Sequence, residues 1–143
     1  MITIYLKSYN KIIRNADVKL FDDLGYDDIL WIDMISPTIK EQKAVESFLD
    51  INLQTRQQVE EIESTSKYSE TESAIICNSN FFVPTDDSFT VEPGSFIVTE
   101  GVLVSVRNAE FRTFNEAAKR LQMNSRAYPT GYHLLISILE VRI

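Results

Sequence analysis

Two adjacent glutamates, Glu60 and Glu61, lie in a segment whose apolar spacing predicts a helix over residues 55–63. At roughly 100° per residue, Val59 and Ile62 share the inner face of this helix, and both glutamates point away from it. These neighbouring carboxylates are the acidic side chains most worth considering for a site, although on the residues alone the pattern is typical of a solvated helix face.

Other acidic residues are weaker candidates for a site. The segment 21–29 holds aspartates on both sides of Gly25, but a calcium loop of the EF-hand type needs ligands at fixed alternate positions and a terminal glutamate. The spacing here differs, and we expect a solvated loop. Asp33 follows Trp31 at the predicted end of a strand, and we interpret it as a turn-capping residue rather than a catalytic acid.

The chain has few of the groups that nucleophilic or zinc chemistry requires. Cys77 lies in an apolar strand pattern, which favours a small core residue over a nucleophile. His133 is the single histidine, and we interpret it as a surface or packing residue, because a tetrahedral zinc site needs several His or Cys ligands. The chain also lacks a phosphate-cradling glycine-rich loop and a G-x-S-x-G elbow. No nucleophile–base pair can be proposed, and we expect that the protein is not an enzyme.

Composition bounds the remaining functions. The chain has 143 residues, of which 44% are hydrophobic, enough for a folded domain with a real core. Its formal net charge of −7 argues against a nucleic-acid partner, because phosphates require a basic surface. The charge is compatible with cation binding, although most acidic proteins are simply soluble. A single cysteine rules out a disulfide within the chain and indicates a reducing compartment.

The elements that would position these groups are organised around residues 29–63. Residues 29–33 form a short apolar run typical of a strand. Pro37 is suited to the first position of a helix, with Ser36 as its N-cap, and Thr38 with Glu41 offers a capping box one turn later. This helix would be followed by a short break and then by the helix over residues 55–63.

The rest of the chain alternates strand and helix patterns. We expect a loop at residues 64–72, a helix over residues 109–123, and a hairpin joined through Glu100–Gly101. We expect strands at residues 2–7, 12–13, 18–20, 29–33, 73–83, 89–91, 95–99 and 102–106, with Pro93–Gly94 as a turn or a break after the strand that begins at residue 89. The fold class is therefore α/β. We predict a mixed sheet of about six or seven strands with helices on its faces, an αβα sandwich, ending in the start of a long helix.

The final helix, from residue 130 or 131, is apolar nearly all round, so it must be buried on several sides. Its longest apolar stretch, residues 132–139, is far below the roughly 20 residues that a spanning helix needs. The first residues lead directly into a strand pattern rather than a signal peptide. We expect this chain to be soluble, and we expect either a continuation of the chain or other subunits to cover the last helix.

Several of these features together resemble the cytoplasmic domain of the CorA family of divalent-cation transporters. The resemblance covers roughly residues 28–143. It rests on Trp31-Ile32-Asp33 ending a strand, Pro37 with Glu41 opening a helix, Phe48-Leu49 closing it, Val59-Glu60-Glu61-Ile62, Arg120-Leu121 and Arg126, and a Gly-x-x-Leu-Leu segment at Gly131, Leu134 and Leu135.

The resemblance implies a regulatory, ion-sensing role in a magnesium or cobalt transporter. Glu60 and Glu61 match the position of an acidic pair that faces a neighbouring subunit, so that a regulatory Mg²⁺ (or Co²⁺) bridges the two and holds the channel shut. No ion would be tightly bound by this chain alone. The resemblance also implies a homopentamer on the cytoplasmic side of the inner cell membrane, with residues 1–128 as the α/β domain and residues 129–143 as the truncated start of a stalk helix.

This sequence departs from the family in one respect. The Gly-Met-Asn signature of the pore mouth is absent, because Met123-Asn124 follows Gln122 at the end of a predicted soluble helix. We therefore expect that this polypeptide does not conduct ions by itself, and that its contact with the membrane would run through C-terminal helices missing from this chain. Two alternatives stay open: the same domain in a zinc-transporting relative, and an α/β protein-interaction domain that binds no ion.

Overall fold

The computed structural model describes residues 1–8, 11–53, 67–70 and 74–142. These residues form a seven-stranded mixed sheet in the order β2-β1-β3-β7-β6-β5-β4. The pairing of β3 with β7 is parallel, and the other pairings in the sheet are antiparallel. The strands are β1 (Ile2–Leu6), β2 (Ile12–Ile13), β3 (Ile29–Ile35), β4 (Lys67–Glu70), β5 (Ile75–Pro84), β6 (Phe89–Thr99) and β7 (Val102–Arg107).

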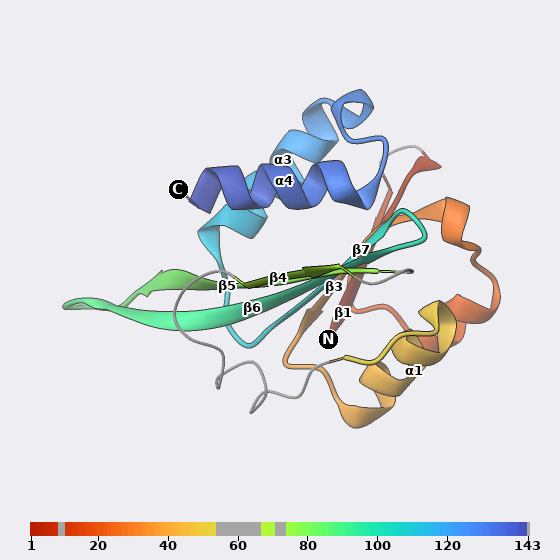
Figure 1. Cartoon of the computed structure of the whole chain (residues 1–143), viewed down its shortest axis with the longest axis horizontal. Coiled ribbons are helices and arrows are strands. Elements are labelled where there is room, and N and C mark those ends of the chain that lie inside the picture. Colours follow the sequence, from red (N-terminus) through yellow and green to blue (C-terminus); the bar gives the residue numbers. More distant parts are fainter. Residues whose placement is uncertain (9–10, 54–66, 71–73, 143) are drawn as a thin grey trace.

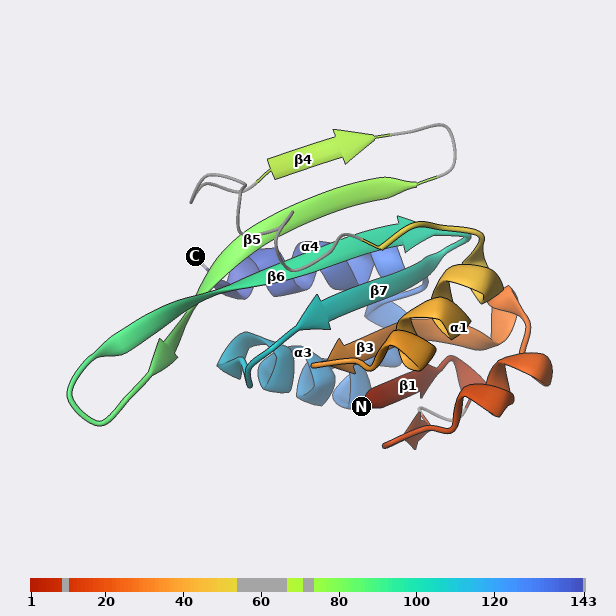
Figure 2. The same ribbon diagram turned by 90° about the horizontal axis from the view of Figure 1, so that it is seen from below.

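Helices cover both faces of the sheet, as the sequence predicts (Figure 1). The helices α3 (Arg112–Met123) and α4 (Gly131–Arg142) lie on one face, and α1 (Ile39–Leu49) lies on the other. Short 3₁₀ turns, η2 (Val18–Asp22), η3 (Tyr26–Asp28) and η4 (Ser125–Ala127), connect these elements. The long hairpin of β5 and β6 projects beyond the other strands (Figure 2).

Each face of the sheet has its own hydrophobic core. Trp31 is fully buried in the core under α3 and α4, together with Phe114 and Leu134. Ile32, the next residue, lies in the core under α1, together with Val45. Successive residues of a strand point to opposite faces. Trp31 and Ile32 are therefore buried on opposite faces of the sheet, as expected for neighbouring residues of a strand that helices cover on both sides.

A β-bulge interrupts this alternation at the start of β3. Tyr5 pairs with Trp31 and Leu6 pairs with Ile29, so the ladder skips Leu30. A bulge inserts one extra residue into one strand and redirects its side chain. As a result, Leu30 and Trp31 both join the core under α3 and α4.

Asp33 corrects our interpretation of it as a turn-capping residue. It lies inside β3, which continues to Ile35, and it is 2% exposed. The Asp33 carboxylate accepts two hydrogen bonds from Arg107 on β7, Nε to Oδ1 at 3.1 Å and Nη2 to Oδ2 at 2.6 Å. Ser105 Oγ donates to Asp33 Oδ1 at 2.8 Å and accepts a bond from Trp31 Nε1, also at 2.8 Å. A buried carboxylate needs such partners, because desolvation of an unpaired charge is costly.

Two further local predictions are wrong because other contacts override the local pattern. Residues 18–20 begin the 3₁₀ turn η2 rather than a strand, because Asp17 caps this turn by accepting a hydrogen bond from the Lys19 N–H at 2.9 Å. Pro93 and Gly94 do not break the chain, since β6 runs through both. Pro93 lies beyond the part of β6 that pairs with β7, where a missing N–H costs little. Gly94 makes room for the ring of Phe81 on β5.

The boundaries of three other predicted elements also change. Within the predicted loop 64–72, residues Lys67–Glu70 form β4, which pairs with β5. The helix α1 begins at Ile39, with Thr38 rather than Ser36 as its N-cap. The helix predicted over residues 109–123 begins at Arg112, because Ala109 and Glu110 connect β7 to it. The predicted hairpin at Glu100–Gly101 is confirmed, and both residues have the positive φ of a tight turn.

The start of α4 is fixed by a close approach of backbone to backbone. The Gly131 N–H donates to the Gly101 carbonyl oxygen in the β6–β7 turn at 2.8 Å. A Cβ atom at Gly131 would collide with the backbone nitrogen of Leu103. This contact directs α4 across the sheet, where Leu134, Leu135 and Ile138 are buried. These three side chains of α4 are therefore covered within the chain itself.

The first prediction concerns this approach. Alanine is normally the better helix former by about 1 kcal/mol. At Gly131 we expect the opposite sign: Gly131→Ala should lower the free energy of unfolding by roughly 1–3 kcal/mol, the range for overpacking. Gly25→Ala is the matched control, because a Cβ atom there meets nothing closer than 3.6 Å. Urea denaturation of both variants is the measurement, and equal stabilities would contradict the packing role of Gly131.

A second prediction comes from the capping box of α1. The Glu41 carboxylate accepts hydrogen bonds from the Thr38 N–H at 3.0 Å and from the amino group of Met1 at 3.1 Å. Burial alone would raise the pKa of Glu41, but these hydrogen bonds and the positive amino group outweigh it and lower the pKa. The stabilisation is present above the pKa of an unfolded glutamate and is lost as the pH falls through the lowered pKa of the folded state.

We therefore expect Glu41→Gln to reduce the free energy of unfolding at neutral pH by roughly 0.3–1 kcal/mol. The difference from the parent protein should shrink as the pH falls through the lowered pKa of Glu41. The measurement is chemical denaturation across a pH series, with the exposed Glu140→Gln as control. A difference that stays constant down to low pH would show that the charge of Glu41 contributes nothing.

Candidate functional site

The acidic pair singled out in the sequence, Glu60 and Glu61, lies outside the described residues, as does the helix predicted over residues 55–63. The preceding segment, from the end of α1 to Leu53, is held by a hydrogen bond to α1. The helix α1 ends at Leu49, and the Glu46 carboxylate accepts a hydrogen bond from the Leu53 N–H at 3.3 Å. Among the residues that the structure describes, no group of three or more His, Cys, Asp or Glu side chains could hold a metal ion.

The other sequence candidates lie apart from one another. The aspartates of segment 21–29 are exposed on and beside the turns η2 and η3, where Asp28 Oδ2 accepts the Gly25 N–H at 2.8 Å. His133 is exposed in the first turn of α4, and its Nδ1 lies 2.8 Å from Thr130 Oγ1. Cys77 is buried in β5, which confirms it as a core residue. The structure does not bring these groups together into one site.

The buried Asp33–Arg107 pair is the charged cluster that sequence reasoning missed. The Arg107 guanidinium carbon lies 4.5 Å from the centre of the Phe114 ring on α3, and its Nη1 donates to the Ala109 carbonyl oxygen at 3.0 Å. Both charges are thus neutralised and covered. The signal that could have found the pair is the strand period, which puts Asp33 in phase with the buried Trp31 and Arg107 in phase with Leu103 and Ser105.

The aromatic side of this cluster is equally closed. The ring of Tyr5 stacks on Trp31, with ring centres 4.3 Å apart. Burial, reinforced by the negative charge of Asp33, raises the pKa of Tyr5 to about 12. Tyr5 therefore stays protonated at neutral pH. The arrangement is that of a structural network rather than a catalytic centre.

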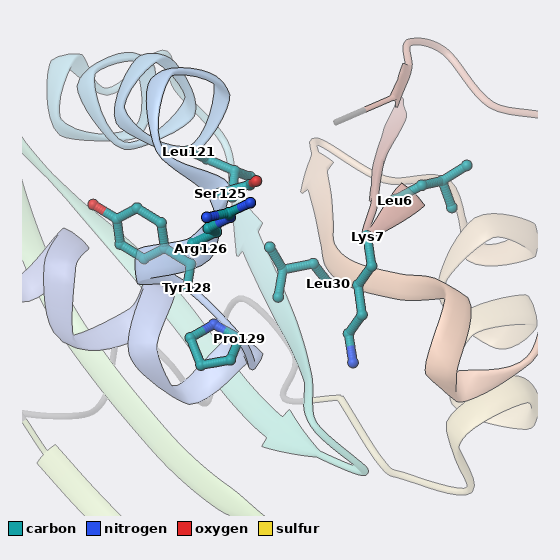
Figure 3. Close-up of a pocket in the computed structure, with 8 residues that line it drawn as sticks. All are labelled: Leu6, Lys7, Leu30, Leu121, Ser125, Arg126, Tyr128 and Pro129. Atoms are coloured by element: carbon teal, nitrogen blue, oxygen red, sulfur yellow. The ribbon is translucent and has the colours of Figure 1, made fainter. Parts of the chain in front are cut away.

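A separate cavity of about 200 Å³ lies between the bulged start of β3 and the connection from α3 to α4 (Figure 3). Its apolar wall comes from both sides, and two cationic side chains, Lys7 and Arg126, face it from opposite sides. The residues that line it are Leu6, Lys7, Leu30, Leu121, Ser125, Arg126, Tyr128 and Pro129. None of the described residues that line it carries a carboxylate. The cavity can therefore accommodate a small group that carries negative charge.

Comparison with known sequences identifies relatives along the whole chain. The family model described as "CorA-like Mg2+ transporter protein" matches residues 26–143. A protein of Wolinella succinogenes named "Magnesium transport protein CorA" is 26% identical over 148 residues, which cover 100% of this chain and 46% of that protein. A protein of the same name from Campylobacter jejuni is 27% identical over 152 residues, again with 100% and 46% coverage. The chain thus spans about half the length of these curated relatives.

Solved structures share the fold at low sequence identity. The complete structure of the CorA magnesium transporter from Methanocaldococcus jannaschii aligns with 97% of this chain and 44% of its own, with a TM-score of 0.63 and 13% identity. The soluble domain of the same transporter aligns with 98% of this chain at a TM-score of 0.58 and 15% identity. The full-length CmaX protein aligns with 99% of this chain at a TM-score of 0.67 and 7% identity.

These findings agree with the arrangement of the elements that carry the family resemblance. The strand that contains Trp31 is part of the one continuous sheet. Gly131 begins the helix α4 and donates a hydrogen bond to the Gly101 carbonyl oxygen in the β6–β7 turn of that sheet. Among the described helices, none is long and apolar enough to cross a bilayer. Because the family model matches well over half of the sequence, the chain belongs to the CorA-like Mg²⁺ transporter family.

Proposed function

We propose that this chain is the cytoplasmic regulatory domain of a CorA-like magnesium transporter. The observation that carries the proposal is the family match over residues 26–143, supported by relatives along the whole chain that are named magnesium transport proteins. The relatives reported above lend no support to a zinc-transporting relative or to an unrelated interaction domain. They also favour a role in transport over catalysis, in keeping with the closed Asp33–Arg107 cluster.

The regulatory step that we propose uses Glu60 and Glu61 as half of a Mg²⁺ or Co²⁺ site between subunits. Two adjacent carboxylates offer Mg²⁺ only a couple of ligands, and this ion gives up its waters reluctantly. The site would be completed by an acidic group of a neighbouring subunit. An ion bound there neutralises charges that otherwise push the subunits apart, so its loss favours the open state, because a ligand shifts an equilibrium by its differential affinity for the two states.

Exposed apolar side chains support the proposal that the domain works in an assembly, which we take to be a homopentamer on the cytoplasmic side of the membrane. On α4, Tyr132 and Ile136 are one turn apart and remain exposed. On the projecting hairpin, the rings of Phe82 and Phe89 contact each other with centres 4.9 Å apart, although both are exposed. Apolar groups gathered in this way are often covered by a partner. In this proposal α4, which starts at Gly131, opens the longer stalk helix.

The third prediction separates the isolated domain from the assembled transporter. Calorimetric titration of the 143-residue chain with Mg²⁺ should detect no tight site. In a full-length transporter that carries this domain, Glu60→Ala with Glu61→Ala should weaken the inhibition of transport by internal Mg²⁺, because half of the inter-subunit site is removed.

The matched control is Asp86→Ala with Asp87→Ala, which removes the same charge from an exposed turn at the end of the β5–β6 hairpin. This control should leave inhibition by Mg²⁺ unchanged. If inhibition in the double glutamate variant equals that of the control, the acidic pair has no gating role. Tight binding of Mg²⁺ by the isolated chain would contradict the inter-subunit character of the site.

A further inference from the structure

The cavity beside the bulge of β3 is lined by residues that have no role in the proposed regulation by Mg²⁺. Within the described residues, the side chains of Lys7 and Arg126 are in no ion pair and no hydrogen bond. The whole chain has 21 acidic and 14 basic residues. In a protein with this excess of acids, two cations that face one cavity, with no carboxylate among its described lining residues, form a distinct positive site.

The fold, rather than the local sequence, holds these two cations together. Lys7 directly follows β1, and its backbone N–H donates to the Asp28 carbonyl oxygen at 3.0 Å, which fixes the strand end beside η3. Arg126 lies in η4, between α3 and α4, where the Tyr128 N–H donates to the Ser125 carbonyl oxygen at 3.1 Å. The backbone on both sides of the cavity is therefore tied down, and Figure 3 shows the two side chains on opposite sides of Leu30.

The cavity also has an apolar part. The bulge turns Leu30 onto the face that carries α3 and α4, and Leu121 lines the same cavity from the end of α3. Pro129 and Tyr128 line the side toward α4, and the ring of Tyr128 points away from the cavity, with its hydroxyl 3.4 Å from Ser137 Oγ on α4 (Figure 3). Sites for small molecules combine such apolar walls with a few polar groups that fix orientation.

We propose that this cavity binds a small organic anion. Its phosphate or carboxylate group lies between Arg126, whose planar guanidinium suits either group, and Lys7, which adds a point charge. Its apolar part packs against Leu30 and Leu121. Such a ligand joins the end of β1 to the α3–α4 connection, so binding stabilises the docking of α4 on the sheet.

Phenyl phosphate is the probe for this proposal. Inorganic phosphate, which lacks the apolar phenyl ring, is the comparison ligand. In NMR titrations of the 143-residue chain, phenyl phosphate should bind saturably, with a Kd on the order of 1 mM for so small a ligand. The amide signals of Leu30, Ser125 and Tyr128 should shift. Inorganic phosphate should bind several-fold more weakly, because it gains nothing from the apolar wall.

Three variants locate the site. Arg126→Gln and Lys7→Gln should each raise the Kd of phenyl phosphate roughly fivefold to tenfold, because each removes one charge-assisted contact. Lys40→Gln, which removes an exposed cation of α1 on the other face of the sheet, should leave the Kd unchanged. All three side chains are exposed, so the variants should fold.

Three results would overturn the proposal. The first is the absence of saturable binding of phenyl phosphate, and the second is equal affinity for phenyl phosphate and inorganic phosphate. The third is an equal Kd in the two cavity variants and the Lys40→Gln control, since binding would then depend on net charge alone. None of these results bears on the role of Glu60 and Glu61, because that role is tested by Mg²⁺ inhibition of transport.

Discussion

The buried ion pair of Asp33 and Arg107 is the interaction on which the rest of this structure depends. It spans β3 and β7, the strands through which β1 and β2 join the hairpins of β4 to β7. Ser105 connects the pair to Trp31, and the Arg107 guanidinium also holds the Ala109 carbonyl oxygen at the entry to α3. The same cluster thus sets the register of the parallel pairing and the path of the chain onto the sheet. Loss of either charge would leave the other buried without its partner.

Local physical rules predicted the parts of the fold whose determinants are close in sequence. The capping box of Thr38 and Glu41 and the tight turn at Glu100–Gly101 both depend on contacts within a few residues. The errors at Asp33 and Gly94 occurred where the deciding contact is distant, whereas the error at residues 18–20 came from a local cap by Asp17 that the strand pattern does not report. Asp33 and Arg107 are 74 residues apart, and no turn rule connects them. Gly94 breaks a local strand pattern, yet within the sheet it makes room for the ring of Phe81.

The candidate sites divide in the same way. Glu60 and Glu61 are adjacent, so the family resemblance indicates them directly in the sequence. The remaining ligands of the proposed ion site would come from a second subunit, and the sequence of one chain does not show how two subunits meet. Lys7 and Arg126 come from opposite ends of the sequence. They line the same cavity only once the bulge at Leu30 and the turn η4 have formed. Sequence patterning reports neither such a cavity nor its charge. Membership of the CorA-like family, in contrast, needs no site geometry, because the match of residues 26–143 to the family model shows it.

A double-mutant cycle on Asp33 and Arg107 tests the central claim most directly. The variants are Asp33→Ala, Arg107→Met and their combination, and the measurement is urea denaturation followed by Trp31 fluorescence. Each single change should cost roughly 3–5 kcal/mol, because it leaves a buried charge without its partner. The double variant should cost much less than the sum, since no charge remains buried. Additive costs would contradict the account, because the two residues would then contribute independently and the network would not act as one unit.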